Sequence, residues 1–317
     1  MKKSHLIAIS MVIFLLAVSV AHAAEGKGKV LFYADIYEGC DNNVNLDSSR
    51  KGDFFTESYA ELGYKKPLTN TLSAIIDYYL VTMNYYKITD ADFYDNNLLL
   101  GLDVNMFGDK VKLGFNNKAE YNYYPNEEIS TYISYNPQLS LRHNFTKSTF
   151  QRLTYDFAVR EYIDRKAQGG TGVAKDKDQQ DMLNGLSYEL AGLFFKGLFV
   201  KVKNQYFTND SNDQNADYYD YWSYKFNATA IIPLLTERLY GLLSVGYQRI
   251  DYGARQLVDD KTKTEKDDLY DISSSLIFDI TKRTSLSINY VYRQNESNEP
   301  SQEYSGSMVS AGLHYAF

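Results

Sequence analysis

Residues 308–317, at the end of the chain, read MVSAGLHYAF. Apolar side chains occupy every second position and alternate with small or polar ones; the apolar set is Val309, Ala311, Leu313, Tyr315 and Phe317, and the other set is Ser310, Gly312, His314 and Ala316. A period of two is that of a β-strand, whose successive side chains point to opposite faces. The stretch therefore predicts a strand with one apolar face that ends on an aromatic residue.

This terminal pattern resembles the last strand of bacterial outer-membrane β-barrel proteins. In that class the strand typically ends in Phe, with an aromatic residue two positions earlier and apolar residues at alternate positions before it; Leu313, Tyr315 and Phe317 match. The resemblance implies an all-β fold, a transmembrane antiparallel up-and-down barrel, and an assembly signature read by the barrel assembly machinery. A buried edge strand of a soluble protein would end in the same way, so the rest of the chain has to decide.

The opposite end of the chain predicts the compartment. Lys2 and Lys3 precede an apolar run over residues 6–20, and residues 21–23 (Ala-His-Ala) form a small-residue cleavage site. This order predicts a secretory signal peptide over residues 1–23 and leaves residues 24–317 as a single barrel domain. The apolar run is shorter than the roughly 20 residues of a spanning helix. Cys40 is the only cysteine, which excludes an intrachain disulfide and predicts a free thiol in a loop.

The composition suits a membrane barrel. The chain has 30 Tyr and 17 Phe but one Trp, and after the signal peptide it has no apolar run long enough for a membrane helix. Alternating lipid-facing strands with aromatic girdles produce this balance. The formal net charge of −7 argues against nucleic acid as a partner, because such binding rests on surplus Lys and Arg.

The chain divides into fourteen predicted strands, an even number that places both ends of the barrel on one side. The predicted ranges are 29–38, 53–65, 71–84, 94–106, 110–122, 128–142, 149–162, 182–195, 198–208, 218–232, 239–252, 268–280, 285–295 and 304–317.

The connections between these strands alternate between short and long. The short ones include a repeat, PLTNTL at 67–72, FTKSTF at 145–150, LLTERL at 234–239 and ITKRTSL at 280–286, with shorter turns at 107–109 and 196–197. Thr, Asn, Asp and Gly supply the local hydrogen bonds or backbone angles that tight turns need. We expect these turns to be periplasmic and the longer, polar connections to be outer loops.

Each predicted strand has an apolar and a charged face. In 149–162, Leu153, Tyr155 and Phe157 alternate with Arg152, Asp156 and Arg160. A Lys or Arg that faces lipid at mid-bilayer costs about 2–4 kcal/mol, so the charged face must point inward. The predicted pore-lining residues are Glu57, Glu61, Asp77, Asp103, Lys112, Lys118, Arg160, Lys201, Lys203 and Lys225.

The predicted inward charges are sorted around the wall. The first four strands carry carboxylates without a basic inward partner, whereas the fifth to tenth are mostly basic. Facing acidic and basic arcs would set a field across a wet lumen and favour polar solutes. The alternative is a network of salt bridges across the lumen that holds the barrel closed. Residues 163–181 are long enough to plug the interior, and the sequence leaves an open and a plugged lumen both possible.

The sequence does not predict an enzyme. After residue 23 only His143 and His314 remain, and neither lies near the predicted outer rim, where barrel hydrolases usually place their chemistry. No HExxH, GxSxG or Gly-rich phosphate motif is present, and no metal site or cofactor is expected.

A second resemblance covers only residues 292–317, YRQNESNEPSQEYSGSMVSAGLHYAF, which look like the final hairpin of β-barrel porin families found beside export systems for surface polysaccharide and surface protein. The predicted function is a porin-like outer-membrane channel for small hydrophilic solutes, with outer-membrane lipid and the assembly machinery as further partners. An export conduit for polysaccharide or protein is the alternative, and a structural barrel without transport is the third.

Overall fold

The structure, a computed structural model, describes residues 28–168, 174–194, 197–213 and 219–317. The predicted signal peptide lies outside the described residues. Within them, no helix is long and apolar enough to cross a membrane.

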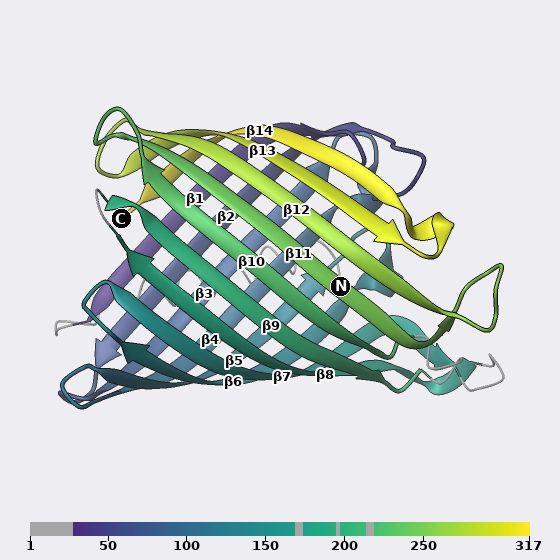
Figure 1. The fold of residues 1–317 in the computed structure, drawn as a ribbon, viewed down its shortest axis with the longest axis horizontal. Helices are drawn as coiled ribbons and strands as arrows, with labels where there is room; N and C mark the ends of the chain where they lie inside the picture. Colours follow the sequence, from purple (N-terminus) through teal and green to yellow (C-terminus); the bar gives the residue numbers. More distant parts are fainter. Residues whose placement is uncertain (1–27, 169–173, 195–196, 214–218) are drawn as a thin grey trace.

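Fourteen antiparallel strands form one closed barrel (Figure 1). Each strand pairs with its neighbours in sequence, and β1 pairs with β14 to close the sheet. Closure leaves no sheet edge unpaired, which is what a strand-built protein needs in lipid. The strands are β1 (Lys29–Asp41), β2 (Asp53–Pro67), β3 (Leu72–Tyr85), β4 (Phe93–Met106), β5 (Val111–Tyr123), β6 (Tyr132–Asn144), β7 (Thr149–Gln168), β8 (Ala174–Leu193), β9 (Phe199–Ser211), β10 (Tyr221–Pro233), β11 (Leu239–Gln256), β12 (Thr264–Asp279), β13 (Thr284–Ser297) and β14 (Tyr304–Ala316).

The two ends of the barrel differ as the sequence predicted. The short connections lie at one end, here called the turn end, and the longer ones lie at the other, the loop end (Figure 1). Among the described residues, short 3-10 helices lie in the loops at η1 (Thr89–Ala91), η2 (Glu128–Ser130) and η4 (Pro300–Gln302). β1 begins and β14 finishes at the turn end.

A threonine closes the tight turns that carry the repeat. The Thr146 hydroxyl accepts hydrogen bonds from the backbone amides of Ser148 and Thr149 at 3.1 and 3.0 Å. Thr69 and Thr281 accept the equivalent pairs of amide hydrogen bonds in their turns. The turn after β4 works differently, because three successive residues, 107–109, adopt positive φ values. These contacts confirm the turn chemistry predicted from the repeat.

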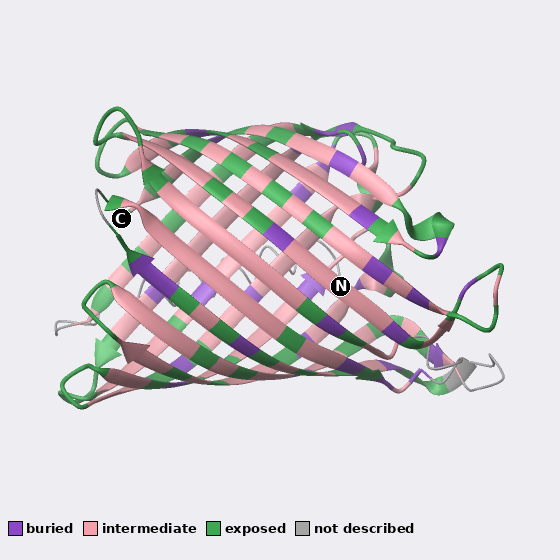
Figure 2. Ribbon diagram, viewed as in Figure 1, coloured by how far each residue is buried: buried purple, intermediate pink, exposed green. Residues whose placement is uncertain are grey.

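The alternating faces are visible along the strands, where exposed residues alternate with less exposed ones (Figure 2). The large exposed side chains of the strands are mostly apolar, such as Leu100 at 50%, Phe115 at 52% and Ile288 at 62%. Phe115 pairs in register with Leu102 and with Leu139, so the apolar face continues from strand to strand. This face forms the outer surface of the barrel.

Several strands differ from the prediction. β11 runs on to Gln256 and β12 begins at Thr264, each four residues beyond the predicted limit, and β6, β7 and β8 differ as follows. β6 begins at Tyr132 because residues 128–130 form η2. β7 ends at Gln168 and β8 begins at Ala174. Most of residues 163–181 therefore continues the paired hairpin beyond the predicted strand ends. An ion pair of 2.7 Å between Lys166 and Asp178 links the two strands there. The described part of this region therefore continues the barrel wall and is not a coiled segment folded into the lumen.

Candidate functional site: the charged lumen

Residues that pair directly in an antiparallel sheet share a face, so the register assigns the interior around the whole barrel. Lys118 pairs with Leu99 on β4 and Asn136 on β6, and Lys203 pairs with Glu189 and Asn227. All ten predicted pore-lining residues lie on this inner face, opposite the exposed apolar face. Their role in conduction stays a prediction.

The ion pairs of the inner wall are local. Asp103 on β4 accepts Lys65 and Lys112, each at 2.6 Å, and Lys118 pairs with Glu120 on the same strand at 2.7 Å. The prediction that Asp103 has no basic partner is therefore wrong. Lys65, near the turn end of β2, lies on the same face as Glu57 and Glu61, but the sequence does not show that its side chain reaches Asp103 on β4.

Other charged side chains of the wall have no ionic partner. Among the described residues, no carboxylate lies within 4.0 Å of Arg160, Lys201, Lys203 or Lys225, and no ion pair links β1–β4 directly to β6–β10. The salt-bridge network that the sequence left open as an alternative is therefore not what holds these strands together.

Aromatic rings support two of the arginines instead. The Arg160 guanidinium carbon lies 4.4 Å from the Tyr132 ring centroid, and that of Arg142 lies 3.6 Å from the Phe150 centroid. Stacking on a ring fixes a guanidinium by its face and leaves its in-plane N–H groups free for other partners.

The acidic side of the wall is also largely free of cations. Glu61 accepts a hydrogen bond from the Tyr59 hydroxyl, and one buried carboxylate oxygen of Asp77 has no hydrogen-bond partner among the described residues. Glu57 has no ion pair within the described part of the chain either. Asp103 is thus neutralised within its own part of the wall, whereas Glu57, Glu61 and Asp77 have no ion pair among the described residues.

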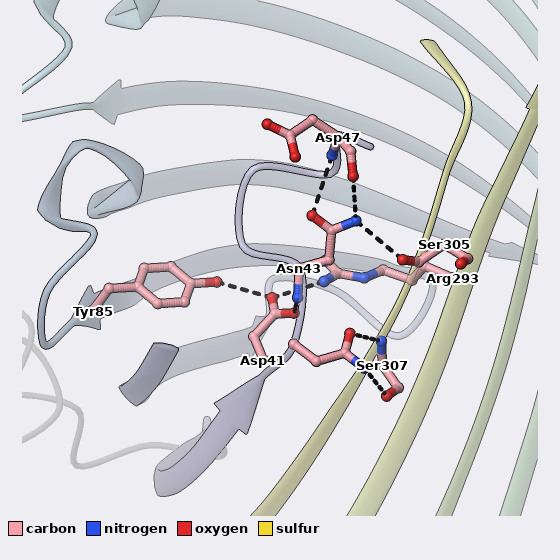
Figure 3. A network of polar contacts seen from close by, with 8 residues as sticks. Asp41, Asn43, Asp47, Tyr85, Arg293, Ser305 and Ser307 are labelled. Carbon is pink, nitrogen blue, oxygen red and sulfur yellow. Dashed lines mark hydrogen bonds and ion pairs between the residues drawn. The ribbon is translucent and has the colours of Figure 1, made fainter. Parts of the chain in front are cut away.

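The first loop, residues 42–52, occupies the loop end of the barrel interior (Figure 3). The Asp41 carboxylate has no solvent exposure and accepts Arg293 at 2.8 Å, the Asn43 amide at 2.9 Å and the Tyr85 hydroxyl at 3.4 Å. The Asn43 side-chain amide donates to the backbone oxygens of Asp47 and Ser305 at 2.8 and 3.0 Å. Strands β1, β3, β13 and β14 therefore hold the start of this loop.

An apolar cluster supports the same loop. Val44 packs with Phe55, Met83 and Tyr85, and Met308 lies against them. Phe55 pairs with Gly39 and Tyr85, so the cluster belongs to the inner face. At the far corner of the loop, hydrogen bonds from Ser49 lower the pKa of Asp47 below its usual value. The first loop is therefore held against the inner face at the loop end.

A hydrogen-bonded chain of three residues crosses the seam where the barrel closes. Nδ1 of His314 on β14 lies 3.0 Å from the Asp35 carboxylate on β1, and Nε2 lies 2.8 Å from the Ser287 hydroxyl on β13. The Asn289 amide donates to the Ser287 hydroxyl at 3.0 Å. The sequence does not reveal this cluster, because Asp35 and His314 meet only when β1 pairs with β14, and His314 by itself lies far from the predicted outer rim.

The assembly signature lies at the same seam, on the outer surface. Leu313 and Tyr315 are exposed, and the Phe317 side chain projects at the turn end with 63% of its surface exposed. Phe317 exchanges two backbone hydrogen bonds with Phe32, of 2.9 and 3.1 Å. The terminal residue therefore closes the barrel, while its recognition by assembly machinery stays a prediction.

Two smaller features are the cysteine and the possible metal ligands. Cys40 is a free thiol with an exposed side chain, but it lies on β1 and not in a loop, because it pairs with Phe54 and Val309. In the part of the chain that the structure describes, no group of three or more His, Cys, Asp or Glu residues could hold a metal ion.

Comparison with known proteins places the fold. No protein-family model and no curated protein match the sequence. Among solved structures, OmpF of Salmonella typhi, in complex with daunomycin, matches with a TM-score of 0.53 at 10% identity, over 92% of this chain and 98% of OmpF. OmpT, an outer membrane protein of Vibrio cholerae, matches with a TM-score of 0.52 at 10% identity, over 92% of this chain and 99% of OmpT. The chain has the fold of bacterial outer-membrane β-barrel proteins.

Proposed function

We propose that the chain is an outer-membrane channel through which small hydrophilic solutes pass along a charged, water-filled lumen. The observation that carries this proposal is the set of inner-wall charges without ionic partners. An isolated charge in a dry interior would cost tens of kcal/mol by solvation arguments, so it would be neutralised or paired. Arg160, Lys201, Lys203 and Lys225 have no carboxylate within 4.0 Å in the described residues, which favours water in the lumen.

The exposure of the paired charges supports the same conclusion. The side chains of Lys65, Lys112 and Arg152 are 41%, 28% and 38% exposed although they face inward. Barrels of about 16 to 18 strands enclose an aqueous channel, and eight-stranded ones are filled by side chains. Fourteen strands stand closer to the channel-forming size.

The distribution of charge suggests what the channel favours. Acidic groups on β1–β4 face a wall whose free cations lie on β6–β10. In a narrow aqueous passage such a field orients water and lowers the free energy of polar and charged solutes relative to apolar ones. The proposed function needs no chemistry from the wall, and small polar solutes are its proposed cargo.

The proposed orientation follows from the two ends. We place the turn end and both barrel termini in the periplasm and the loop end outside the cell, with the apolar outer surface against outer-membrane lipid. Phe317 would then meet the barrel assembly machinery from the periplasmic side.

Planar-bilayer recording of the purified full-length barrel in simple salt tests the proposal. Discrete open steps are expected. Permanently closed wild-type barrels, in membranes where a known porin conducts, would contradict passive passage and favour the export conduit. The Arg293→Met variant distinguishes a lumen blocked by the first loop from a lumen closed by the barrel wall. Conductance steps that appear in this variant but not in the wild type would show that the first loop blocks the lumen.

A further inference from the structure

The chain of Asp35, His314 and Ser287 has the contacts of a nucleophilic catalytic site. The Ser287 hydroxyl oxygen lies 2.8 Å from Nε2 of His314, and Nδ1 on the other side of the ring lies 3.0 Å from the Asp35 carboxylate. A carboxylate beside Nδ1 favours the tautomer with its proton there, in which Nδ1–H donates to Asp35 and the Ser287 hydroxyl donates to Nε2. This is the order in which a base activates a serine while a carboxylate orients the base. We infer that Ser287 is an acylatable nucleophile and that the lumen hydrolyses short-chain esters of hydrophilic alcohols.

The strand register builds this arrangement. His314 pairs with Asp35 on β1 and with Ser285 on β13, so its ring lies between the two neighbouring strands. Gly312 occupies the next inward position on β14, opposite Ser287. A Cβ at Gly312 would overlap the Tyr37 ring and lie 3.1 Å from the Ser287 oxygen. The absence of a side chain there lets serine, imidazole and Tyr37 come together.

Neighbouring contacts position the base. The Tyr37 ring meets the His314 ring edge to face, with centroids 5.2 Å apart. The His314 and Asp35 side chains are 21% and 22% exposed, so the lumen reaches both groups, while Ser287 is 4% exposed. A rigid base next to a nearly buried serine suits an attack on a small carbonyl group that enters from the lumen.

Asn289 places a side-chain amide donor beside the nucleophile. Its Nδ2 atom lies 3.0 Å from the Ser287 oxygen and 3.3 Å from the Ser310 oxygen. A side-chain amide next to the nucleophile can stabilise the negative charge of a tetrahedral intermediate. Sheet hydrogen bonds occupy the backbone amides of these strands, so this side chain is the donor that the seam offers.

The surroundings indicate the substrate class. Ile277 on β12 pairs directly with Ser287 and is an apolar neighbour for a short acyl group. Ser275 and Ser310 lie on the same face and suit the hydroxyl groups of a polar alcohol. A short acyl ester of a hydrophilic alcohol matches this surrounding, with its acyl group beside the apolar residue and its alcohol beside the polar ones.

The reaction would balance in two steps. The Ser287 oxygen adds to the ester carbonyl carbon while its proton moves to Nε2 of His314; the carbon–oxygen bond to the alcohol breaks, and the alcohol leaves with that proton. Water then attacks the acyl-serine, His314 takes the water proton and returns a proton to Ser287, and the carboxylic acid leaves.

A fluorophosphonate probe tests the inference on the full-length folded barrel. We expect one covalent adduct per chain, located on Ser287 by peptide mass analysis and absent in Ser287→Ala. His314→Gln, which can keep hydrogen bonds to both neighbours, should slow labelling by about 10²–10⁴-fold, the usual contribution of a general base. Hydrolysis of 4-nitrophenyl acetate should fall in parallel.

Ser244 is the matched control, because it faces the lumen and bonds Thr229 and Asn227 but contacts no histidine. Ser244→Ala should label like the wild type. Heat-modifiable migration in electrophoresis checks that each variant is folded. The inference would be overturned if folded wild type were labelled no faster than folded Ser287→Ala, or if labelling were unchanged in His314→Gln. The cluster would then serve only to close the seam. Conductance is measured separately, so a failure here is distinct from a failure of the proposed channel.

Discussion

Replacing Arg293 with Met should release the first loop from the barrel interior. The change removes the cation that lies 2.8 Å from the Asp41 carboxylate, whose side chain has no solvent exposure. Breaking a fully buried pair by removing one partner costs about 3–5 kcal/mol. Arg293 is 26% exposed and Asp41 keeps its bonds from Asn43 and Tyr85, so the lower range for a charged hydrogen bond, about 1.5–3 kcal/mol, applies.

The loss should appear as local opening and not as unfolding of the barrel, because β1, β13 and β14 keep their strand pairing. A cost in that range increases the open population about ten- to hundredfold, since each 1.4 kcal/mol is a factor of ten. Trypsin cleavage after Arg50 or Lys51, which are exposed in the loop, reports this opening.

Arg249→Met is the control for this prediction, because it breaks an ion pair of 2.8 Å with Asp268 on the outer surface. It should leave cleavage at the loop unchanged. Adding Asp41→Asn to Arg293→Met should restore part of the protection, because the buried charge is then gone. Equal cleavage rates in wild type and Arg293→Met would show that this contact does not hold the loop.

The other predictions concern closure and packing. Deleting Phe317 removes two backbone hydrogen bonds to Phe32, which together contribute about 1–3 kcal/mol. The deletion should lower the amount of assembled barrel in the outer membrane and the temperature at which the barrel dissociates on heat-modifiable gels. A normal amount and a normal temperature would show that this residue has no role in closure or assembly. Gly312→Ala should destabilise the seam by about 1–3 kcal/mol, because the added methyl group would overlap the Tyr37 ring. Gly253→Ala is the control and should leave the dissociation temperature unchanged, because the nearest atom to its added methyl group is 3.9 Å away. Equal dissociation temperatures for the two variants would contradict the close packing at Gly312.

Sequence alternation was enough to predict the strand count and the inner face, because a period of two sends successive side chains to opposite faces and a charge is costly in lipid. Lys112, Lys201 and Lys203 occupy the predicted face for that reason. The threonine repeat likewise predicted the tight turns, since a hydroxyl two residues before an amide forms the same local bond in every copy.

Sequence alternation could not predict contacts that form only when the barrel closes or a loop folds inward. Asp35 and His314 are neighbours only because β1 pairs with β14, a contact between the two ends of the chain. The first loop enters the interior because Asn43 and Val44 find partners on β3 and β14, whereas composition gave it the same polar character as the other outer loops. Asp103 on β4 forms an ion pair with Lys65 on β2, because a lysine side chain is long enough to reach across the strand between them.

The most direct test of the charged lumen is the reversal potential of single channels under a salt gradient, compared between wild type and Lys201→Glu/Lys203→Glu. Both lysines lie on the inner face without an ionic partner among the described residues, so reversing them changes the free charge of the wall. We expect a clear shift in ion preference towards cations, with heat-modifiability unchanged. Open channels whose reversal potential equals that of the wild type would place these lysines outside the conduction path and contradict a lumen whose wall charges face the permeating ions.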